Sequence, residues 1–353
     1  MNIQLDTHQH DWNRFVSEQS GHILQRWEYG AVRQNMQTEI LHLAFYEGGK
    51  IQAVIQMSLH PIPYLPWKVG YIPRGPVVRK NFSEDAWLEL FKALTQIAKS
   101  QNLAFIKIEP NITAHTDEQA VWSQIIQKLS IPAAQNPRFM NATSMIDLTQ
   151  SEETLLQNCR KNTRYYIRKA PRENIIYEEA TNPEDLKDFY SLLSETADRQ
   201  NFQLGARPVT YFESLWTQFR KKDQNDCNLR LFFAKIGTER VATVLNFYDQ
   251  NTAYYPYGAS SSKARGTAAT EGLMWHAISE AKKSGLKMYD LWGILPTENK
   301  EHPYWGYTFF KQGFGGKTVE YVGSYDFPII SFAYTPLQYL EKLRRSLLKI
   351  KPH

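Results

Sequence analysis

One pattern occurs twice along the chain, and it constrains the fold more than any other feature. Around Gly48-Gly49, and again around Gly237, apolar and polar residues alternate on both sides of the turn, which is typical of two strands joined by a tight hairpin. Each hairpin is followed by a segment with helical periodicity, LFKALTQIAKS or LMWHAISEAKK, and then by an alternating strand. The sequence therefore predicts two copies of one mixed α/β unit.

The order hairpin, helix, strand is typical of acyltransferases of the GNAT type. The predicted fold class is therefore α/β, with mixed sheets in two tandem GNAT-like domains. A chance similarity between two common patterns stays open as the alternative. The predicted boundary follows the strand-like stretch ATSMIDL, which assigns residues 1–148 to the first domain and residues 149–322 to the second. The short interval between Trp216 and Cys227 leaves no room for a long coiled-coil arm.

Composition is that of an ordinary globular protein. Hydrophobic residues make up 42% and charged residues 22%, and a net charge of +5 permits a polyanionic partner without requiring one. The N-terminus lacks a signal-peptide pattern and no stretch approaches the about 20 apolar residues that span a bilayer, so a cytoplasmic location is expected. Neither the spacing of Cys159 and Cys227 nor that of the histidines predicts a disulfide or a metal site.

A basic helical segment follows the predicted boundary and ends at Pro171. No acidic residue stands between Glu153 and Glu173, and three arginines recur every four residues: Arg160, Arg164 and Arg168. Because guanidinium groups pair well with phosphates, this face is a candidate for contacting a phosphate backbone or a diphosphate. A solvated face packed by aliphatic stems is the alternative.

Two charged side chains are candidates for catalysis. Glu109 closes the strand FIKIEP, where its carboxylate would emerge at the carboxyl end of a sheet and receive a proton from an amine. Lys311 lies in the octet FKQGFGGK and is flanked by Phe309, Phe310 and Phe314, so its ammonium would be partly desolvated and suited to an oxyanion. The glycines of that octet would let the backbone approach a ligand. A water-bound carboxylate and a lysine in a solvent-facing turn are the alternatives.

Two other segments leave alternatives open. The stretch AYYPYGASSSKARG, which contains Tyr257, could form a pocket wall or pack into the core, and KARGTAATEG only loosely matches the cradle with which GNAT enzymes bind the coenzyme A pyrophosphate. Near the C-terminus, Leu340, Leu343 and Leu347 share one face of a basic helix. That helix could contact an anionic membrane or a nucleic acid, or pack its leucines on the nearest domain.

Five ordered motifs resemble the Fem family of non-ribosomal peptidyltransferases, which build the cross-bridge of bacterial peptidoglycan. They span nearly the whole chain and read LQRWEYGAVR, YIPRGPVV, LLQNCRKNTRYYIRKA, ETADRQNF and FKQGFGGKTVEYVGSYDFPI. The resemblance implies an aminoacyltransferase that takes an aminoacyl group from aminoacyl-tRNA and places it on the side-chain amine of a muramyl pentapeptide, carried by UDP or by lipid. It also implies two GNAT-like domains, with residues from about 323 to 353 returning to the first domain.

The resemblance assigns roles to single residues. Lys311 matches the lysine that stabilises the tetrahedral intermediate, and Glu109 matches an acidic position near the accepting amine, where Asp is more usual. Arg33 and Arg199 match basic positions that meet the nucleotide diphosphate, and Arg33 stands where Lys is more usual. The remaining acceptor-binding candidates are Tyr71, Arg74, Gly75 and Tyr257. The chain resembles the armless form of the family, so Arg160, Arg164 and Arg168 become the candidates for binding tRNA.

The implied reaction is a direct transfer in a ternary complex. An ester is already activated, so no cofactor, ATP or metal is expected, and the enzyme mainly aligns the reactants and stabilises the oxyanion. The expected form is a monomer in the cytoplasm, with contact to the inner face of the membrane through the basic C-terminal helix. A GNAT-like N-acyltransferase that uses acyl-CoA or another donor, and a non-catalytic protein that binds tRNA or a cell-wall precursor, stay open as alternatives.

Overall fold

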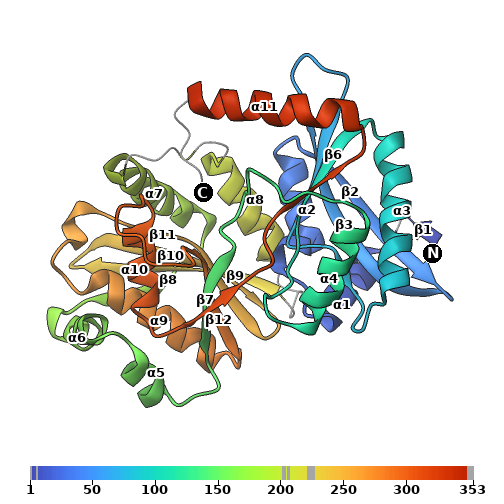
Figure 1. The fold of residues 1–353 in the computed structure, drawn as a ribbon. Coiled ribbons are helices and arrows are strands. Elements are labelled where there is room, and N and C mark those ends of the chain that lie inside the picture. Colours follow the sequence, from blue (N-terminus) through green and yellow to red (C-terminus); the bar gives the residue numbers. More distant parts are fainter. Residues whose placement is uncertain (1, 5–6, 201–203, 205–206, 221–226, 348–353) are drawn as a thin grey trace. The chain divides into compact units, whose positions relative to one another are not determined.

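The computed structural model describes residues 2–4, 7–200, 204, 207–220 and 227–347 (Figure 1). The chain divides into two compact units, each with its own mixed sheet. Unit 1 comprises Met1–Asn141 and Glu320–His353, and unit 2 comprises Ala142–Val319. The limits expected from the sequence were residue 148 and about residue 323.

Unit 1 is built on a sheet with the strand order β1-β2-β3-β4-β6-β14, in which β5 pairs with β3. Strands β4 and β6 run parallel, and the other neighbours are antiparallel. Its strands are β1 (Asn2–Gln4), β2 (Glu39–Glu47), β3 (Lys50–Pro61), β4 (Lys68–Pro73), β5 (Val77–Val78), β6 (Leu103–Glu109) and β14 (Tyr325–Pro328). Its helices are α1 (Gln9–Glu18), the 3₁₀ turn Ile23–Gln25, α2 (Trp27–Asn35), α3 (Glu84–Ser100), α4 (Asp117–Lys128) and α11 (Ser331–Leu347).

Local sequence explains the main elements of unit 1. Gly48 and Gly49 form the β2–β3 turn at φ values of +55° and +75°, a conformation that residues with a Cβ rarely adopt. The Ser83 side chain accepts a hydrogen bond from the backbone N–H of Ala86 and so caps α3. Every residue of β6 is buried, as expected for a central strand in a parallel pair.

Unit 2 has the strand order β13-β7-β12-β11-β10-β9-β8, and β11 and β12 run parallel. Its strands are β7 (Ala142–Asp147), β8 (Ile176–Glu179), β9 (Cys227–Ile236), β10 (Glu239–Asp249), β11 (Thr252–Ser260), β12 (Met288–Ile294) and β13 (Lys317–Glu320). Its α-helices are α5 (Glu152–Asn158), α6 (Lys161–Lys169), α7 (Leu186–Gln200), α8 (Val209–Phe219), α9 (Ala269–Lys283) and α10 (Trp305–Gln312). Its 3₁₀ turns are Ala170–Glu173, Pro183–Asp185 and Ser262–Ala264.

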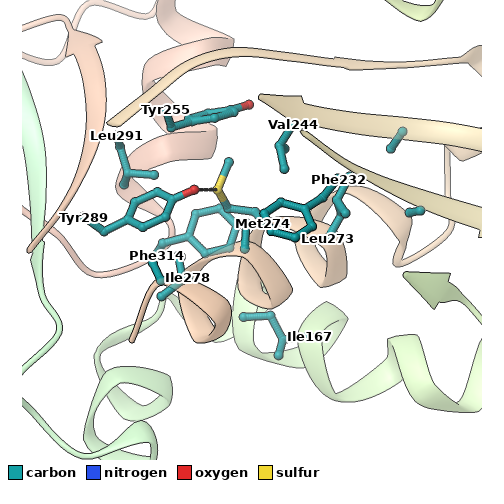
Figure 2. Packing of buried hydrophobic residues seen from close by; sticks show 14 of the residues in the cluster. Ile167, Phe232, Val244, Tyr255, Leu273, Met274, Ile278, Tyr289, Leu291 and Phe314 are labelled. Carbon is teal, nitrogen blue, oxygen red and sulfur yellow. Dashed lines mark hydrogen bonds between the residues drawn. The ribbon is translucent and has the colours of Figure 1, made fainter. Parts of the chain in front are cut away.

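The core of unit 2 lies between α9 and the sheet. Leu273, Met274 and Ile278 of α9 point towards the strands, where Tyr289 donates its hydroxyl hydrogen bond to Asn246 and also approaches the Met274 sulfur (Figure 2). Large apolar side chains enclosed in this way supply most of the stabilisation of such a layer. The same packing fixes β11 and β12 beneath the candidate site.

The two units share one topology. The order β2, β3, β4, α3, β6 in unit 1 recurs as β9, β10, β11, α9, β12 in unit 2, with the parallel pair in the same place. A further strand then pairs antiparallel with the last strand of each set, β14 with β6 and β7 with β12. The predicted duplication is therefore confirmed.

The sequence was wrong about the basic helix after the boundary. One helix was expected from about Glu152 to Pro171, but α5 ends at Asn158 and α6 begins at Lys161, because Cys159 and Arg160 adopt extended backbone conformations. The longest described helices, α3 and α11, have 17 residues each, so the described part of the chain contains no long helical arm. None of the described helices is long and apolar enough to cross a bilayer.

Candidate active site

In unit 2 the candidate site lies where two parallel strands part. Strands β11 and β12 pair only from Thr252–Tyr254 with Met288–Asp290, although both continue further. Beyond the last pair, β11 presents Tyr255 and β12 presents the Gly293 carbonyl, and both lie near Lys311 of α10. Where two strands separate, backbone carbonyls that would otherwise be hydrogen-bonded to the neighbouring strand can bond to other groups. Ligands in α/β folds bind at such places.

Lys311 is fully buried at the end of α10. Its Nζ donates a hydrogen bond to the Gly293 carbonyl at 3.2 Å, and it lies 3.9 Å from the centre of the Tyr307 ring and 5.5 Å from that of Tyr255. Burial lowers the pKa of Lys311 well below its ordinary value, and nearby Asp290 opposes that shift. The neutral form of the Lys311 amine is therefore easier to populate than that of an exposed lysine.

Asp290 supplies negative charge beside Lys311. Its carboxylate is buried and accepts hydrogen bonds from the Thr143 hydroxyl and from the Trp292 backbone N–H. Trp292 has a φ of +64°, and the register between β12 and β7 shifts between Asp290 and Gly293. Asp290 therefore holds an irregular turn of β12 that directs the Gly293 carbonyl towards Lys311.

The surroundings of Lys311 differ from those predicted. On α10, Phe309 points outward and lies 3.6 Å beneath the Arg160 guanidinium, and Phe314 packs in the core (Figure 2). A helix directs neighbouring residues to different sides, so Lys311 meets Tyr307, one turn earlier, instead.

The glycines of the octet are explained by packing within unit 2. A Cβ on Gly313 would lie 2.4 Å from the Thr163 hydroxyl, and one on Gly315 would lie 2.5 Å from the Asn158 carbonyl. Gly315 also has a φ of +77°. Their close approach to the chain itself, rather than to a ligand, accounts for glycine at these positions.

Tyr257 and Arg207 flank the same tyrosine cluster. The Tyr257 hydroxyl lies 3.2 Å from that of Tyr211, and the Arg207 guanidinium lies 5.7 Å from the Tyr257 ring centre. The charge of Arg207 also reaches Tyr307, whose pKa is raised chiefly by burial. Arg207 was not predicted from the sequence, because nothing in the stretch ARPVTYF shows which ring the guanidinium meets.

Arg199 of α7 lies beside β11. Its Nη2 is 3.3 Å from the Ser260 hydroxyl, whereas its Nη1 is buried without a hydrogen bond and lies 3.8 Å from a Glu195 oxygen. Ser260 also lines a pocket of about 200 Å³ at the start of α9. Arg199 thus keeps hydrogen-bonding capacity for an anion.

The segment KARGTAATEG, which loosely matched a pyrophosphate-binding loop, is occupied by the carboxylate of Glu173. The Ala268 backbone N–H at the start of α9 donates to Glu173 at 2.7 Å, and Lys169 pairs with the same carboxylate at 2.7 Å. Both contacts lower the pKa of Glu173. An anion at this helix start would have to displace Glu173.

In unit 1, Glu109 organises the end of β6. Its buried carboxylate accepts hydrogen bonds from the Tyr71 hydroxyl at 2.6 Å, from the backbone N–H groups of Arg138 and Phe139, and from the Ser324 hydroxyl. The pKa of Tyr71 is raised by burial and by Glu109. Four donors already occupy the oxygens of this carboxylate, so the geometry favours a positioning role for Glu109.

Arg74 and Gly75 are held tightly next to this site. Arg74 has a φ of +51° and is buried, with its guanidinium 3.9 Å from the Tyr321 ring centre and 3.4 Å from the Met140 carbonyl. A Cβ on Gly75 would lie 2.6 Å from the Gln25 side chain. Both residues shape the wall around Tyr71 and Glu109.

Arg33 of α2 and Arg138 both act electrostatically on His60. His60, at the end of β3, has its pKa lowered to about 4 by burial and by the charges of Arg33 and Arg138. Its Nε2 lies 2.9 Å from the Ser58 hydroxyl. Two guanidinium groups that both act on one neutral imidazole form a suitable binding site for an anion. Arg33 was predicted from the sequence, but His60 and Arg138 were not, because they lie far from Arg33 along the chain.

The three arginines of the basic segment do not share one free face. Arg160 stacks on Phe309, and Arg164 donates hydrogen bonds to the Gln157 and Cys159 carbonyls at the end of α5. Arg168 is exposed, and so are the nearby Lys161 and Arg172. Arg168, Lys161 and Arg172 are therefore the positions best placed to meet a phosphate backbone.

Comparisons with known proteins agree with this architecture. The FemAB family matches residues 7–236 and 228–342, which together include nearly the whole chain. The chain belongs to the FemAB family. The predicted membership of the Fem family is therefore confirmed. Among relatives, a lipid II:glycine glycyltransferase of Staphylococcus epidermidis is 23% identical over 99% of this chain and 97% of that protein. A Staphylococcus aureus protein of the same description is 21% identical with the same coverage.

Solved structures share the fold of this FemAB-family chain. A crystal structure of FemX superposes with a TM-score of 0.85 at 19% identity, covering 96% of this chain and 100% of that one. A tandem GNAT protein from the clavulanic acid biosynthesis pathway gives a TM-score of 0.51 at 9% identity, covering 91% and 94%. The predicted tandem GNAT-like fold is confirmed. The staphylococcal alignments extend over 421 and 426 positions, so those relatives contain segments that these 353 residues lack.

Proposed function

We propose that this protein transfers an aminoacyl group from aminoacyl-tRNA to the stem-peptide side-chain amine of a muramyl pentapeptide, in the synthesis of peptidoglycan bridges. The observation that carries the proposal is the buried Lys311, which lies beside the rings of Tyr307 and Tyr255 and donates a hydrogen bond to the Gly293 carbonyl, in a chain of the FemAB family. The names of the staphylococcal relatives support a lipid-linked acceptor, and a UDP-linked acceptor presents the same amine.

Lys311 is the proposed catalytic residue. Because burial disfavours its charged form, the amine of Lys311 can accept the proton that the attacking amine loses as its nitrogen bonds to the ester carbonyl carbon. The resulting ammonium faces the oxyanion that forms at the same moment, and each opposite charge stabilises the other. When the intermediate collapses, the bond to the 3′ oxygen of the tRNA breaks and that oxygen leaves with the proton.

Arg33, with His60 and Arg138, is the proposed site for the diphosphate of the acceptor. Replacement of Arg33 by Ala should raise the KM for the UDP-linked acceptor about tenfold or more, because a charge-assisted contact to phosphate is lost, and leave the KM for charged tRNA unchanged. Arg79→Ala, at an exposed position of unit 1, is the matched control. Equal effects of Arg33→Ala on both substrates would contradict the assignment, and Arg199→Ala is tested in the same way.

The exposed basic residues around α6 are the proposed contacts to tRNA. Replacement of Lys161, Arg168 and Arg172 by Gln should weaken tRNA binding and flatten its dependence on salt, by close to one unit of slope for each phosphate contact removed. Filter binding at several salt concentrations measures both effects. The control is Lys187→Gln, an exposed lysine on α7. A salt slope equal to that of the wild type would show that these basic residues are only solvated and do not contact tRNA.

The acyl-CoA alternative has less support from the described residues. Glu173 occupies the backbone N–H at the start of α9, where a coenzyme A pyrophosphate would need donors. A purely binding protein would gain nothing from a lysine buried at a cost in stability. The direct test follows the ester bond of radiolabelled glycyl-tRNA. Loss of that ester should depend on the muramyl pentapeptide, and acceptor-independent loss would contradict the proposal.

A further inference from the structure

Helix α11 of unit 1 is fixed by its polar side. Tyr334 and Gln338 each donate a hydrogen bond at 3.1 Å to the same carboxylate oxygen of Asp326. The other oxygen of Asp326 accepts from Lys107 at 2.6 Å, and Ala333 is buried on this side of the helix. The polar contacts of α11 are thus made with its own unit.

The opposite side of α11 is apolar and faces outward. Phe332, Tyr339, Leu340 and Leu343 are 76%, 69%, 55% and 49% exposed. This order is the reverse of a normal surface helix, which turns its apolar side inward. The alternative in which the leucines of this segment pack on the nearest domain is therefore wrong for Leu340 and Leu343.

The loop between β3 and β4 extends this apolar surface. Its tip carries Tyr64, fully exposed, and Leu65, 39% exposed, and no charged residue lies between Ile62 and Trp67. Backbone hydrogen bonds close the loop, from Ile62 N–H to the Trp67 carbonyl and from Leu65 N–H to the Ile62 carbonyl. The Trp67 ring packs against that of Phe332 with centroids 5.8 Å apart, so the loop and α11 meet (Figure 1).

The exposed charge that the described part of α11 places beside this surface is basic, and the sequence that follows it is basic too. Lys342 is exposed on α11, and from Lys342 to Lys351 the sequence has five basic residues and no acidic one. Glu341, the residue before Lys342, lies 3.9 Å from Arg138. An apolar face edged by cations and by tyrosine and tryptophan rings matches the interface of an anionic bilayer, where rings and aliphatic chains enter the headgroup region and cations meet lipid phosphates.

We infer that Tyr64, Leu65, Phe332, Tyr339, Leu340 and Leu343 form a docking surface for an anionic phospholipid bilayer. Two separate elements of unit 1 supply this surface, and their ring contact holds them together. A second copy of the chain would meet like charges at the Lys342 edge, and a nucleic acid would not need the apolar tip. The inference concerns the surface alone and holds whether the acceptor is carried by lipid or by UDP.

The test is flotation of the purified chain with vesicles. Wild type should float with vesicles of phosphatidylcholine and phosphatidylglycerol in equal amounts, and much less with phosphatidylcholine alone or at high salt. Leu340→Gln/Leu343→Gln and Tyr64→Ser/Leu65→Ser should each lower the partition coefficient about tenfold or more, because buried apolar area is lost. Ile176→Gln, at a 55% exposed position of unit 2, is the matched control and should bind as the wild type does. Melting temperatures equal to that of the wild type show that the variants fold.

Two results would overturn the inference. One is a wild-type chain that stays out of the phosphatidylglycerol vesicles, or helix and loop variants that float as well as the wild type. The other is a stable dimer in sedimentation equilibrium that Leu340→Gln/Leu343→Gln separates, since the apolar surface would then belong to a contact between two copies.

Discussion

Replacement of Lys311 by Met lowers the turnover of aminoacyl transfer about a hundredfold or more, and raises the thermal stability of the chain. The loss of rate follows because the amine that takes up the proton and then, as an ammonium, faces the oxyanion is gone. The gain in stability follows because the folded state holds the pKa of Lys311 below its unfolded value near 10.5, so unfolding takes up a proton wherever the pH lies between those two values. Methionine has a similar volume and carries no charge to bury.

Single-turnover kinetics and thermal melts at several pH values measure both effects. Between the lowered pKa of Lys311 and its unfolded value, the wild type should gain stability as pH rises, because the unfolded state binds more protons there. The variant should lack this dependence, and Lys317→Met, at an exposed lysine of unit 2, should change neither rate nor stability. An unchanged rate in Lys311→Met would remove Lys311 from the mechanism.

Asp326→Asn should destabilise unit 1 by about 3–5 kcal/mol, because it leaves the Lys107 ammonium buried without its partner. The two side chains are 5% and 0% exposed and lie 2.6 Å apart, and the same carboxylate holds Tyr334 and Gln338 of α11. Denaturant unfolding measures the loss. Asp85→Asn, at an exposed position, is the control and should have little effect.

A double variant distinguishes the effect of the ion pair between Lys107 and Asp326 from the effect of packing at this site. Lys107→Met/Asp326→Leu removes both charges together and should recover most of the stability that Asp326→Asn loses, since no buried charge then lacks a partner. Equal losses in the single and double variants would show that the packing of this site, rather than the ion pair, carries the effect.

Local sequence patterns predicted the repeated unit because each hairpin and helix is specified within a short stretch. The turn at Gly48-Gly49 and the cap at Ser83 depend only on neighbouring residues. The parallel strands of each unit follow from the same order of elements. Duplication was readable because two such stretches occur at matching intervals.

The surroundings of the candidate site were harder to predict. Lys311 stands among phenylalanines in the sequence, yet its neighbours are Tyr307, one helical turn away, and Tyr255 on β11. The donors to Glu109 come from residues 138–139 and from Ser324, more than two hundred positions further along the chain. Contacts of that range depend on tertiary packing, which periodicity does not encode.

The orientation of α11 could not be predicted from the sequence either. The sequence placed leucines on one side of a basic helix, but the side that packs is chosen by the carboxylate of Asp326. A buried anion that holds Tyr334 and Gln338 directs Leu340 and Leu343 to solvent. The amphipathic pattern predicted that this helix has an apolar face and a basic face, but not which face packs against unit 1.

The measurement that tests the central proposal most directly is the mass of the acceptor. The purified chain would be incubated with muramyl pentapeptide in its UDP-linked form and, separately, its lipid-linked form, each with a mixture of charged tRNAs. At least one acceptor should gain the mass of one aminoacyl residue. Uncharged tRNA should give no gain, and the Lys311→Met variant should give much less product than the wild type. No gain on either acceptor from the folded wild-type chain would contradict the proposed aminoacyl transfer.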